Sequence, residues 1–332
     1  MSGHVLVIGN PLMDQLTFVN SDDIARLGIS PGSMSLIESS EADRLSTFFD
    51  NWVLAPGGSE TNTAVGIASL GGKVNLIGAI ADDELGKKYQ DDLRRYETID
   101  INFEIYEQTV HRMGTGASYV LVLPDGERTM LTYLGASRLF SAKAIEKSYF
   151  AGAKAVYFDA YILDLPAGPD ILDKLFGCVQ DLGTTVIFGL ADMNVVERHY
   201  DVINALTEKI DVLLANEAEI KALMKTDDVT EALFRLPGEQ LRAAVTRGDK
   251  GAVIYENKIP RTIEAVPVEK VIDTTGAGDQ FAAGICFGIL HDMSFEAAAR
   301  LGAAAAAEVI GHLGARPDGP LLELTDNLNL GA

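Results

Sequence analysis

Short apolar runs alternate with helical stretches along most of this chain, and this alternation limits the possible folds more than any other feature of the sequence. From Ala136 onward the alternation is regular. Strands separated by helices build a mostly parallel sheet with helices packed on its faces. The pattern therefore predicts an α/β protein. Its second half is expected to contribute strands at residues 154–160, 185–190, 210–215, 242–246 and 251–255.

The first half of the chain adds two strands to this sheet. Val5-Leu-Val-Ile8 is a continuous apolar run that ends at Gly9, as is typical of a strand buried on both faces, and residues 73–80 form a second such run. Ligands bind open α/β sheets beyond the carboxyl ends of their strands. Asn10 and Asp14 follow such an end and are candidates for holding a polar substrate. A turn asparagine and a helix-capping aspartate would explain them equally well.

Two segments, residues 15–40 and 105–134, break the pattern with short alternating runs that are typical of a small sheet. Pro124-Asp-Gly-Glu127 is a hairpin turn signal between the last two runs. We expect both segments to form a β-sheet lid outside the α/β core. The core is then expected to comprise residues 1–14, 41–104 and 135–332, with a helix over residues 45–52.

The charge of the chain excludes several classes of partner. A formal net charge of -21 and a pI near 4.5 argue against binding of a nucleic acid or an anionic membrane. No apolar segment reaches membrane-spanning length, and the first residues show neither a basic region nor a cleavage site, so we expect a cytoplasmic protein. Cys178 and Cys286 lie in apolar segments, which favours buried thiols over a disulfide or a metal site.

The strongest local signal is Asp273-Thr-Thr-Gly-Ala-Gly-Asp279, which runs into an apolar helical stretch at residues 281–290. Gly276 and Gly278 allow successive backbone N–H groups to converge on one point, and the helix adds the positive end of its dipole. Such a cradle suits an anion. Asp279 is either a helix cap or the base that removes a proton from an attacking group.

Two further motifs place polar residues at the ends of core elements. Gly57-Gly58 precedes a helix that carries Asn62 in its first turn, and Asn216 and Glu219 follow the predicted strand 210–215. A Gly-Gly pair followed by an asparagine is a weak signal alone, because many loops contain two glycines.

Together these motifs resemble those of the ribokinase-like (phosphofructokinase-B type) family of sugar and nucleoside kinases, over essentially the full chain. Gly57-Gly-Ser-Glu-Thr-Asn62 is similar to the family's N-terminal signature, and residues 273–279 are similar to its highly specific C-terminal signature. Gly9-Asn-Pro-Leu-Met-Asp14 is most like the adenosine kinase branch. The resemblance implies a doubly wound, mostly parallel sheet flanked by helices, a small β-sheet lid over the substrate, and ATP-dependent phosphorylation of an alcohol.

The resemblance also assigns the acceptor site. Asp14 is implied to accept hydrogen bonds from the paired ribose hydroxyls. Asn10, Asn62 and the N–H groups of Gly57 and Gly58 complete the implied sugar pocket.

The surroundings of the implied base are less well defined. Met34 stands where eukaryotic adenosine kinases have a polar residue, so recognition of the base is expected to differ, and Tyr161 or Ile162 is expected to cover its face. Arg112 and Arg128 of the lid segments either contact phosphate or are solvated, and solvated side chains are the more common case.

The implied chemistry is in-line transfer of the γ-phosphoryl group. Asp279 takes the proton of the attacking hydroxyl, and the N–H groups of Gly276, Ala277 and Gly278 stabilise the transferring oxygens.

The resemblance implies ATP and Mg²⁺ as cofactors. Asn216 and Glu219 are similar to a motif that holds the metal through water, with Glu219 as its carboxylate. Thr246 and Gly248 are expected near the ribose or phosphates of ATP. His312 is either a plain helix-end residue, which is the more common role, or a contact of the adenine.

Several alternatives stay open at this point. A monovalent cation such as K⁺ beside Asp273 and Thr275 is one, because many family members use it. The favoured acceptor is the 5′-hydroxyl of a nucleoside, adenosine first, and the alternative is a sugar kinase of the ribokinase or fructokinase type. A dinucleotide-binding oxidoreductase is disfavoured because the first strand lacks the spaced glycines that a pyrophosphate needs. The oligomeric state is monomer or homodimer.

Overall fold

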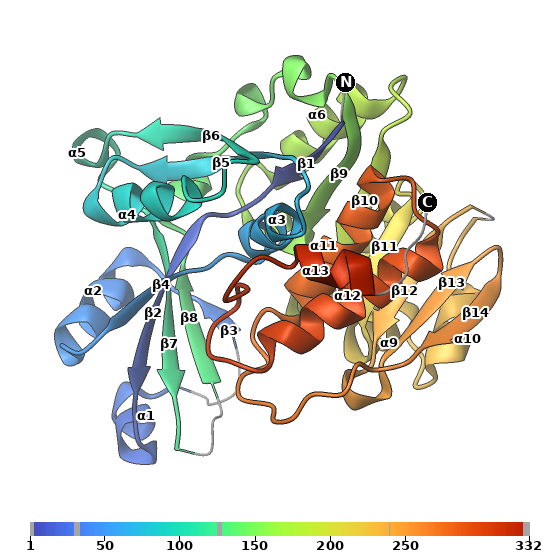
Figure 1. Ribbon diagram of the computed structural model, residues 1–332. Helices are drawn as coiled ribbons and strands as arrows, with labels where there is room; N and C mark the ends of the chain where they lie inside the picture. The colour runs from blue at the N-terminus through green and yellow to red at the C-terminus, as the bar shows by residue number, and fades with distance from the viewer. Residues whose placement is uncertain (1–2, 30–33, 125–127, 239, 328–332) are drawn as a thin grey trace.

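The computed structural model describes residues 3–29, 34–124, 128–238 and 240–327, and over these residues the chain forms two sheets (Figure 1). The larger sheet runs through the body of the molecule between layers of helices. The smaller sheet projects from one side of this body, at the lower left of the view.

Nine strands of the described residues form the larger sheet, and seven of them, from β12 to β6, run parallel. The last two, β13 and β14, are antiparallel additions at one edge. The predicted α/β fold with a mostly parallel sheet is therefore confirmed. In spatial order the strands are β14 (Ile259–Ile263), β13 (Ala252–Glu256), β12 (Arg242–Thr246), β11 (Val212–Asn216), β10 (Thr185–Gly189), β9 (Ala153–Asp159), β1 (His4–Ile8), β5 (Val74–Ala81) and β6 (Ile99–Tyr106).

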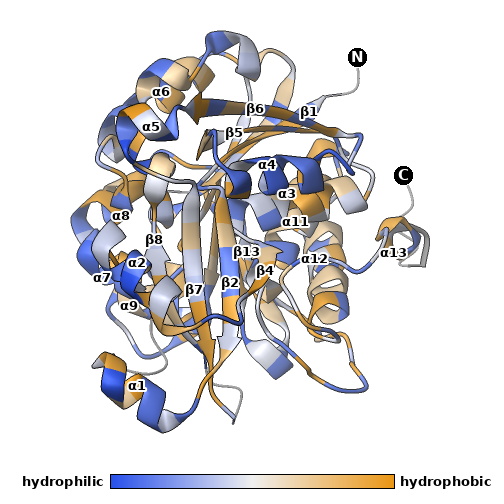
Figure 2. Cartoon of the chain, turned by 90° about the vertical axis from the view of Figure 1, so that its left-hand side faces the viewer, coloured by the Kyte–Doolittle hydropathy of each residue, from blue (hydrophilic) through white to orange (hydrophobic). Residues whose placement is uncertain are grey.

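Helices cover both faces of this sheet, so its strands are apolar on both sides (Figure 2). Leu6 and Ile8 of β1 pack on one face, and Val5 and Val7 pack on the other. The helices on the first face are α6 (Gly168–Val179), α7 (Met193–Arg198), α8 (Tyr200–Leu206), α9 (Glu217–Met224) and α10 (Val229–Arg235). Those on the second face are α3 (Ser59–Ser69), α4 (Glu84–Leu93), α11 (Ala277–Leu290) and α12 (Phe295–Val309).

The smaller sheet has one covered face and one face that borders a cavity. Leu27 of α1 (Ser21–Leu27) and Leu45 of α2 (Ser39–Phe48) pack with Tyr119 on the covered face. Ser118 and Thr132 belong to the alternate set of residues and line the cavity on the other face. In order, the strands are β3 (Met34–Leu36), β8 (Arg128–Tyr133), β7 (Gly116–Val122), β2 (Leu12–Phe18) and β4 (Val53–Pro56).

The expected boundaries between core and lid were wrong in three places. β2 begins at Leu12, which puts Asp14 in the smaller sheet, and β4 joins it although residues 41–104 were expected in the core. Ile105, expected in the lid, pairs with Ile80 in the larger sheet. A short alternating strand does not reveal its partners, because the same pattern fits any sheet with one open face.

Two smaller expectations need adjustment as well. The helix predicted over residues 45–52 is α2, which ends at Phe48 so that the chain can enter β4. Residues 125–127 of the predicted hairpin turn, and residues 30–33 of the predicted lid segment 15–40, lie outside the described residues. Cys178 and Cys286 are buried free thiols, as predicted.

Candidate active site

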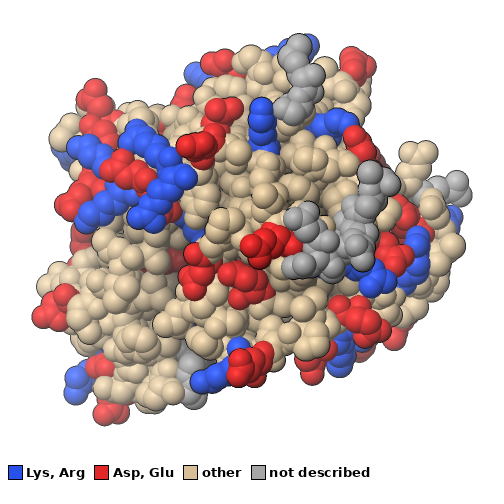
Figure 3. Space-filling view, in the orientation of Figure 1, with Lys and Arg blue, Asp and Glu red and all other residues tan. Residues whose placement is uncertain are grey.

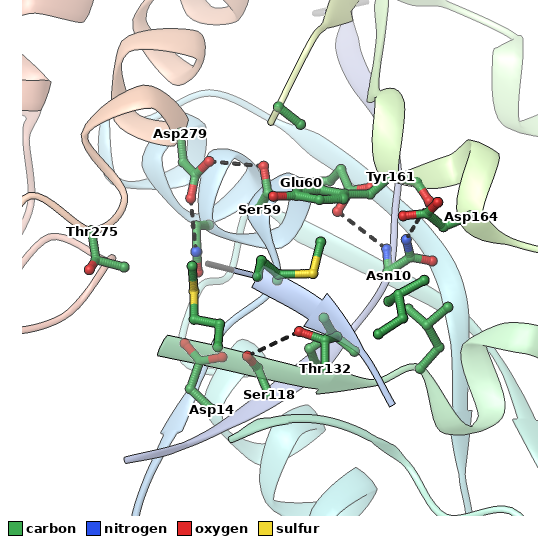
Figure 4. Close-up of a pocket in the computed structure, with 18 residues that line it drawn as sticks. Asn10, Asp14, Ser59, Glu60, Ser118, Thr132, Tyr161, Asp164, Thr275 and Asp279 are labelled. Carbon is green, nitrogen blue, oxygen red and sulfur yellow. Dashed lines mark hydrogen bonds between the residues drawn. The ribbon is translucent and has the colours of Figure 1, made fainter. Parts of the chain in front are cut away.

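Two cavities meet at the start of α11. Pocket A, of about 200 Å³, lies against the open face of the smaller sheet, and pocket B, of about 270 Å³, lies at the carboxyl ends of β10, β11 and β12. Ser59, Ala191 and Asp279 line both cavities. Asp279 therefore stands at the junction of the two pockets (Figure 4).

The turn before α11 leaves backbone donors free beside pocket B. Gly276 has φ +79°, and a Cβ there would lie 2.4 Å from the Ala315 carbonyl oxygen, so glycine is required. Among the described residues, no acceptor bonds the N–H groups of Gly276 and Gly278, whereas the Ala277 N–H reaches the Thr274 carbonyl at 3.3 Å. A Cβ on Gly278 would meet nothing within 4 Å. An anion can thus approach the positive end of α11.

Asp279 is held by two side-chain donors from α3. Ser59 Oγ lies 2.9 Å from Oδ1, and Asn62 Nδ2 donates to Oδ2 at 3.0 Å. Burial raises the pKa of Asp279 to about 6, against the opposing effects of these two hydrogen bonds and of the Arg316 guanidinium. The two hydrogen bonds therefore fix the direction of the carboxylate.

Arg316, which no pattern in the sequence singled out, fixes the orientation of Asn62. Its Nε donates to Asn62 Oδ1 at 3.1 Å, its Nη2 lies 3.4 Å from the Gly57 carbonyl oxygen, and its Nη1 pairs with Asp92. Because Asn62 Oδ1 is engaged by this guanidinium, Asn62 Nδ2 must face Asp279. The guanidinium also opposes the rise in the pKa of Asp14 and of Asp279.

The predicted acceptor residues come together in pocket A. A Cβ on Gly57 would lie 2.4 Å from Asp14 Oδ2, and one on Gly58 would lie 2.5 Å from the Asn10 carbonyl oxygen, so both glycines allow close packing here. Asn10 Nδ2 donates to the Tyr161 carbonyl at 3.5 Å, and its Oδ1 has no partner among the described residues. Figure 4 shows Asp14 and Asp279 on one side of the pocket and Asn10 and Tyr161 on the other.

The Asp14 carboxylate carries no hydrogen bond from the described residues. Burial raises the pKa of Asp14 to about 7, and the nearby Asp279 charge adds to this rise while Arg316 and Arg128 oppose it. A ligand with two hydroxyl donors would satisfy this carboxylate and favour its charged form.

Apolar side chains line much of the rest of pocket A, beside the polar residues Ser118, Thr132 and Asp164. Met34 and Leu36 of β3 and Met130 of β8 line it from the smaller sheet, together with Leu134 and Tyr161. Methionine side chains adapt to flat, polarisable groups. Pocket A thus joins a polar end, around Asp14 and Asp279, to an apolar end.

Pocket B brings together Asn216, Glu219 and Thr246 of the residues predicted for the metal and the nucleotide. Asn216 and Glu219 form a capping box at the start of α9: Asn216 N donates to Glu219 Oε2 at 2.8 Å, and Asn216 Nδ2 donates to Oε1 at 2.5 Å. Burial raises the pKa of Glu219 to about 7. Thr246 lines the same pocket at the end of β12. One buried carboxylate whose oxygens are already hydrogen-bonded suits Mg²⁺ that is held through water.

Two residues expected near ATP do not line pocket B. Gly248 is exposed, with φ +61°, in a short 3₁₀ turn. His312 Nδ1 lies 3.2 Å from the Leu313 carbonyl oxygen, and Glu308 and Asp318 raise the pKa of His312 against its partial burial. The neighbouring Gly311 lines a separate groove with Val268, Glu269, Lys270, Ile272 and Ala307.

Arg128 is not the solvated residue that the sequence suggested. Its Nη2 donates to Asp273 Oδ2 at 2.6 Å and its Nη1 donates to Thr275 Oγ1 at 2.7 Å. Thr275 and the Gly314 N–H donate further hydrogen bonds to Asp273, and together these contacts hold its pKa below the usual range despite burial. A guanidinium therefore neutralises the carboxylate that was considered for a monovalent cation. Arg112, by contrast, is exposed.

The sequence reasoning also missed two buried acids beside Asp279. Asp159 ends β9 with no exposed surface, and Glu60 of α3 is 1% exposed. Ser59 Oγ lies 2.7 Å from Asp159 Oδ2 and so connects these acids to Asp279. Asp159 stands at the carboxyl end of an apolar strand, as Asn10 and Asn216 do. Polar residues at these strand ends were taken as candidates because ligands bind there, and the same criterion would have selected Asp159.

Within the described residues, no group of three or more His, Cys, Asp or Glu side chains is arranged to hold a metal ion. No described helix is long and apolar enough to cross a membrane. Acidic and basic side chains are interspersed over the face that Figure 3 shows, including a mixed cluster near α4 with the ion pairs Lys88–Glu84 and Arg94–Asp91.

Comparison with known proteins agrees with this geometry. The family model described as pfkB family carbohydrate kinase matches residues 25–321. The crystal structure of adenosine kinase from Sinorhizobium meliloti is 33% identical and covers 98% of this chain and 99% of its own, with a TM-score of 0.91. That of a "probable sugar kinase protein" from Rhizobium etli CFN 42 is 32% identical over 99% of both chains, with a TM-score of 0.92.

A more distant relative is 5-dehydro-2-deoxygluconokinase from Lacticaseibacillus casei, which is 27% identical over 279 residues, or 80% of this chain and 84% of that protein. The expected resemblance to ribokinase-like kinases and to their adenosine kinase branch is confirmed by these matches. Because the family model spans most of the chain and solved structures superpose on nearly all of it, the chain belongs to the pfkB family of carbohydrate kinases.

Proposed function

We propose that this protein transfers the γ-phosphoryl group of ATP to the 5′-hydroxyl of a nucleoside, with adenosine as the favoured acceptor. The observation that carries the proposal is the place of Asp279, at the junction of pockets A and B. A base at this point reaches an acceptor hydroxyl in pocket A and faces a phosphoryl donor in pocket B.

The nucleoside is proposed to lie along pocket A. Its paired ribose hydroxyls donate to the free Asp14 carboxylate, while Asn10 Oδ1 accepts a further donor from the substrate. The base then occupies the apolar end, beside Met34, Met130 and Tyr161. Gly57 and Gly58 let α3 approach the sugar, and Asn62 directs its amide at Asp279.

The chemical step follows from these positions. Asp279 takes the proton of the 5′-hydroxyl as its oxygen bonds to the γ-phosphorus, and the bond from the γ-phosphorus to the bridging oxygen breaks to release ADP. The free N–H groups of Gly276 and Gly278, with that of Ala277, are proposed to stabilise the charge on the transferring oxygens. Each such donor contributes on the order of 3 kcal/mol in comparable oxyanion sites.

Mg²⁺, when bound, neutralises part of the triphosphate charge. Glu219 is proposed to hold it through water, since its oxygens are already hydrogen-bonded to Asn216. Thr246 is proposed to face the phosphates or ribose of ATP, with Gly248 further out. The adenine of ATP is proposed to use the groove of Ile272, Ala307 and Gly311, which His312 adjoins.

Arg128 is proposed to replace a monovalent cation at Asp273. Exchange of K⁺ for tetramethylammonium at constant ionic strength is therefore expected to change kcat by less than about twofold, because the guanidinium already neutralises that carboxylate. Initial rates in matched chloride buffers measure this. An activation by K⁺ of about tenfold would show that Asp273 and Thr275 do bind the ion.

The alternative acceptor is a free sugar, as in kinases of the ribokinase or fructokinase type. The names of the Rhizobium etli and Lacticaseibacillus casei proteins favour it, and the polar end of pocket A would suit a sugar alone. The apolar end supports the nucleoside, because a free sugar would leave it unfilled.

A panel of acceptors tests the proposal. Adenosine, inosine, guanosine, cytidine, ribose and fructose are each supplied with ATP and Mg²⁺, and kcat/KM is measured from ADP release. We expect adenosine to exceed ribose by about 10² or more, since the base adds buried contacts. Phosphorylation of ribose or fructose but of none of the nucleosides would contradict the nucleoside assignment.

A further inference from the structure

Behind Asp279, a chain of hydrogen-bonding groups extends into the core. Ser59 Oγ lies 2.9 Å from Asp279 Oδ1 on one side and 2.7 Å from Asp159 Oδ2 on the other. The Glu60 carboxyl lies beside that of Asp159, and its Oε2 accepts from the Asn10 N–H at 3.4 Å. Figure 4 shows Ser59 beside Asp279, with a dashed line for the hydrogen bond between them. This series of hydrogen-bonded side chains therefore connects the buried acids Asp159 and Glu60 with the junction of the two pockets.

Counting protons shows that two ionised aspartates cannot both satisfy Ser59. A serine hydroxyl has one proton, so it donates to one of the two carboxyl oxygens at a time. The other close contact is attractive only if that carboxyl group is protonated and donates to Oγ. One proton must therefore reside on Asp159 or on Asp279.

The surroundings place that proton on Asp159. Asp279 accepts from Asn62 Nδ2 at 3.0 Å and feels the positive charge of Arg316, and both favour its ionised form. Asp159 has no cationic partner among the described residues. Burial and the charge of Asp279 raise the pKa of Asp159, against the opposing hydrogen bonds from Ser59, Glu60 and the Tyr161 N–H, the last at 2.9 Å. The pKa of Glu60 is itself raised well above normal by burial and by Asp159, so Glu60 keeps its own proton and adds no negative charge. Tyr157 and Tyr161, whose pKa values burial raises well above normal, stay neutral.

We propose that Asp159 is a positioning residue that acts through Ser59: it retains one proton, directs the Ser59 hydroxyl at Asp279 and so keeps Asp279 the ionised, oriented base. This inference rests on the proposed role of Asp279. In the resulting arrangement Asp159 Oδ2–H donates to Ser59 Oγ, and Ser59 Oγ–H donates to Asp279 Oδ1. The second oxygen of Asp279, which Asn62 orients, is left to take the proton of the acceptor hydroxyl.

The arrangement has a pH window. Burial raises the pKa of Asp159 to about 7, and that of Asp279 to about 6. Activity requires Asp279 to be ionised, so it is lost as the pH falls through about 6. It also requires Asp159 to be protonated, so it declines as the pH rises through about 7, when a second charge competes for the Ser59 proton. The pH dependence of kcat/KM is therefore expected to be bell-shaped.

The test compares pH profiles of kcat/KM for the wild type and Asp159→Asn, with ATP, Mg²⁺ and whichever acceptor of the panel is turned over. We expect kcat/KM of the wild type to fall about fivefold to tenfold between pH 7 and pH 9, because the Ser59 hydroxyl then no longer donates to Asp279 and one hydrogen bond is lost. In Asp159→Asn the amide donates to Ser59 at every pH. We therefore expect this variant to keep at least about a third of the wild-type kcat/KM at pH 7, and its kcat/KM to fall by less than about twofold between pH 7 and pH 9.

Three controls make the result decisive. Ser59→Ala removes the connection and is expected to lower kcat by about tenfold at pH 7, with no alkaline decline. Asp211→Asn alters an aspartate that accepts the Val186 N–H at 2.7 Å at the other end of the strands, and it should keep the wild-type profile. Asp279→Asn reports separately on the base.

Each outcome decides one question. If Asp159→Asn keeps the alkaline decline of the wild type, or loses as much activity as Asp279→Asn, the proposed role of Asp159 is wrong. If Asp279→Asn is nearly as active as the wild type, the proposed function of Asp279 fails, whatever Asp159→Asn shows. An inactive Asp279→Asn with an unchanged profile in Asp159→Asn overturns the positioning role alone.

Discussion

Asp279→Asn is expected to lower kcat by roughly 10² or more while the Kd values of both substrates stay within a few-fold. The amide has almost the same shape as the carboxylate and can keep the contacts with Ser59 and Asn62, but it cannot take the proton of the attacking hydroxyl. Stopped-flow or steady-state rates measure kcat, and isothermal titration calorimetry measures binding.

The helix-cap alternative for Asp279 is not what the structure shows, because the N-cap of α11 is Gly276 and no side chain caps this helix start. The substitution therefore tests the role of Asp279 as the base. Turnover within a few-fold of the wild type would remove Asp279 from the role of base. Thermal unfolding of the same preparation guards against a loss of activity that is only a loss of fold.

Asp14→Asn is expected to lower kcat/KM for adenosine by about 10², chiefly through KM, because two hydroxyl donors lose a charged acceptor. The same substitution should cost much less with 2′-deoxyadenosine, which offers one hydroxyl of the pair. The values of kcat/KM for the wild type and Asp14→Asn, each with adenosine and 2′-deoxyadenosine, form a double-mutant cycle. The cycle measures the coupling between the Asp14 carboxylate and the 2′-hydroxyl.

That cycle also tests where the sugar lies. Equal losses on adenosine and 2′-deoxyadenosine would mean that Asp14 does not contact the 2′-hydroxyl. The Asp14 carboxylate would then act at a distance, for example through its charge on Asp279 and Arg316.

The parts of this site that the sequence predicted are those with local causes. Gly276 must be glycine because of its own backbone conformation, and Asn216 and Glu219 meet because they are three residues apart at a helix start. The buried parallel strands could also be predicted locally, because a strand that is buried on both faces is apolar at consecutive positions.

The parts that were missed depend on contacts between distant segments. Arg316 reaches Asn62 across 254 positions, Ser59 reaches Asp159 across 100, and Arg128 reaches Asp273 across 145. No local pattern marks such a pair, because each side chain alone also fits an exposed loop or a strand end. Residues 12–14 and Val53–Pro56 were placed in the core instead of the smaller sheet for the same reason.

The most direct test of the proposed function is the identity of the product. Purified protein is incubated with adenosine, ATP and Mg²⁺, and the products are followed by proton-coupled ³¹P spectroscopy and by chromatography. We expect adenosine 5′-monophosphate and ADP in equal amounts, with a phosphorus signal coupled to the two protons of C5′. No phosphorylated adenosine, together with a sugar phosphate formed from ribose or fructose under the same conditions, would contradict the nucleoside kinase assignment.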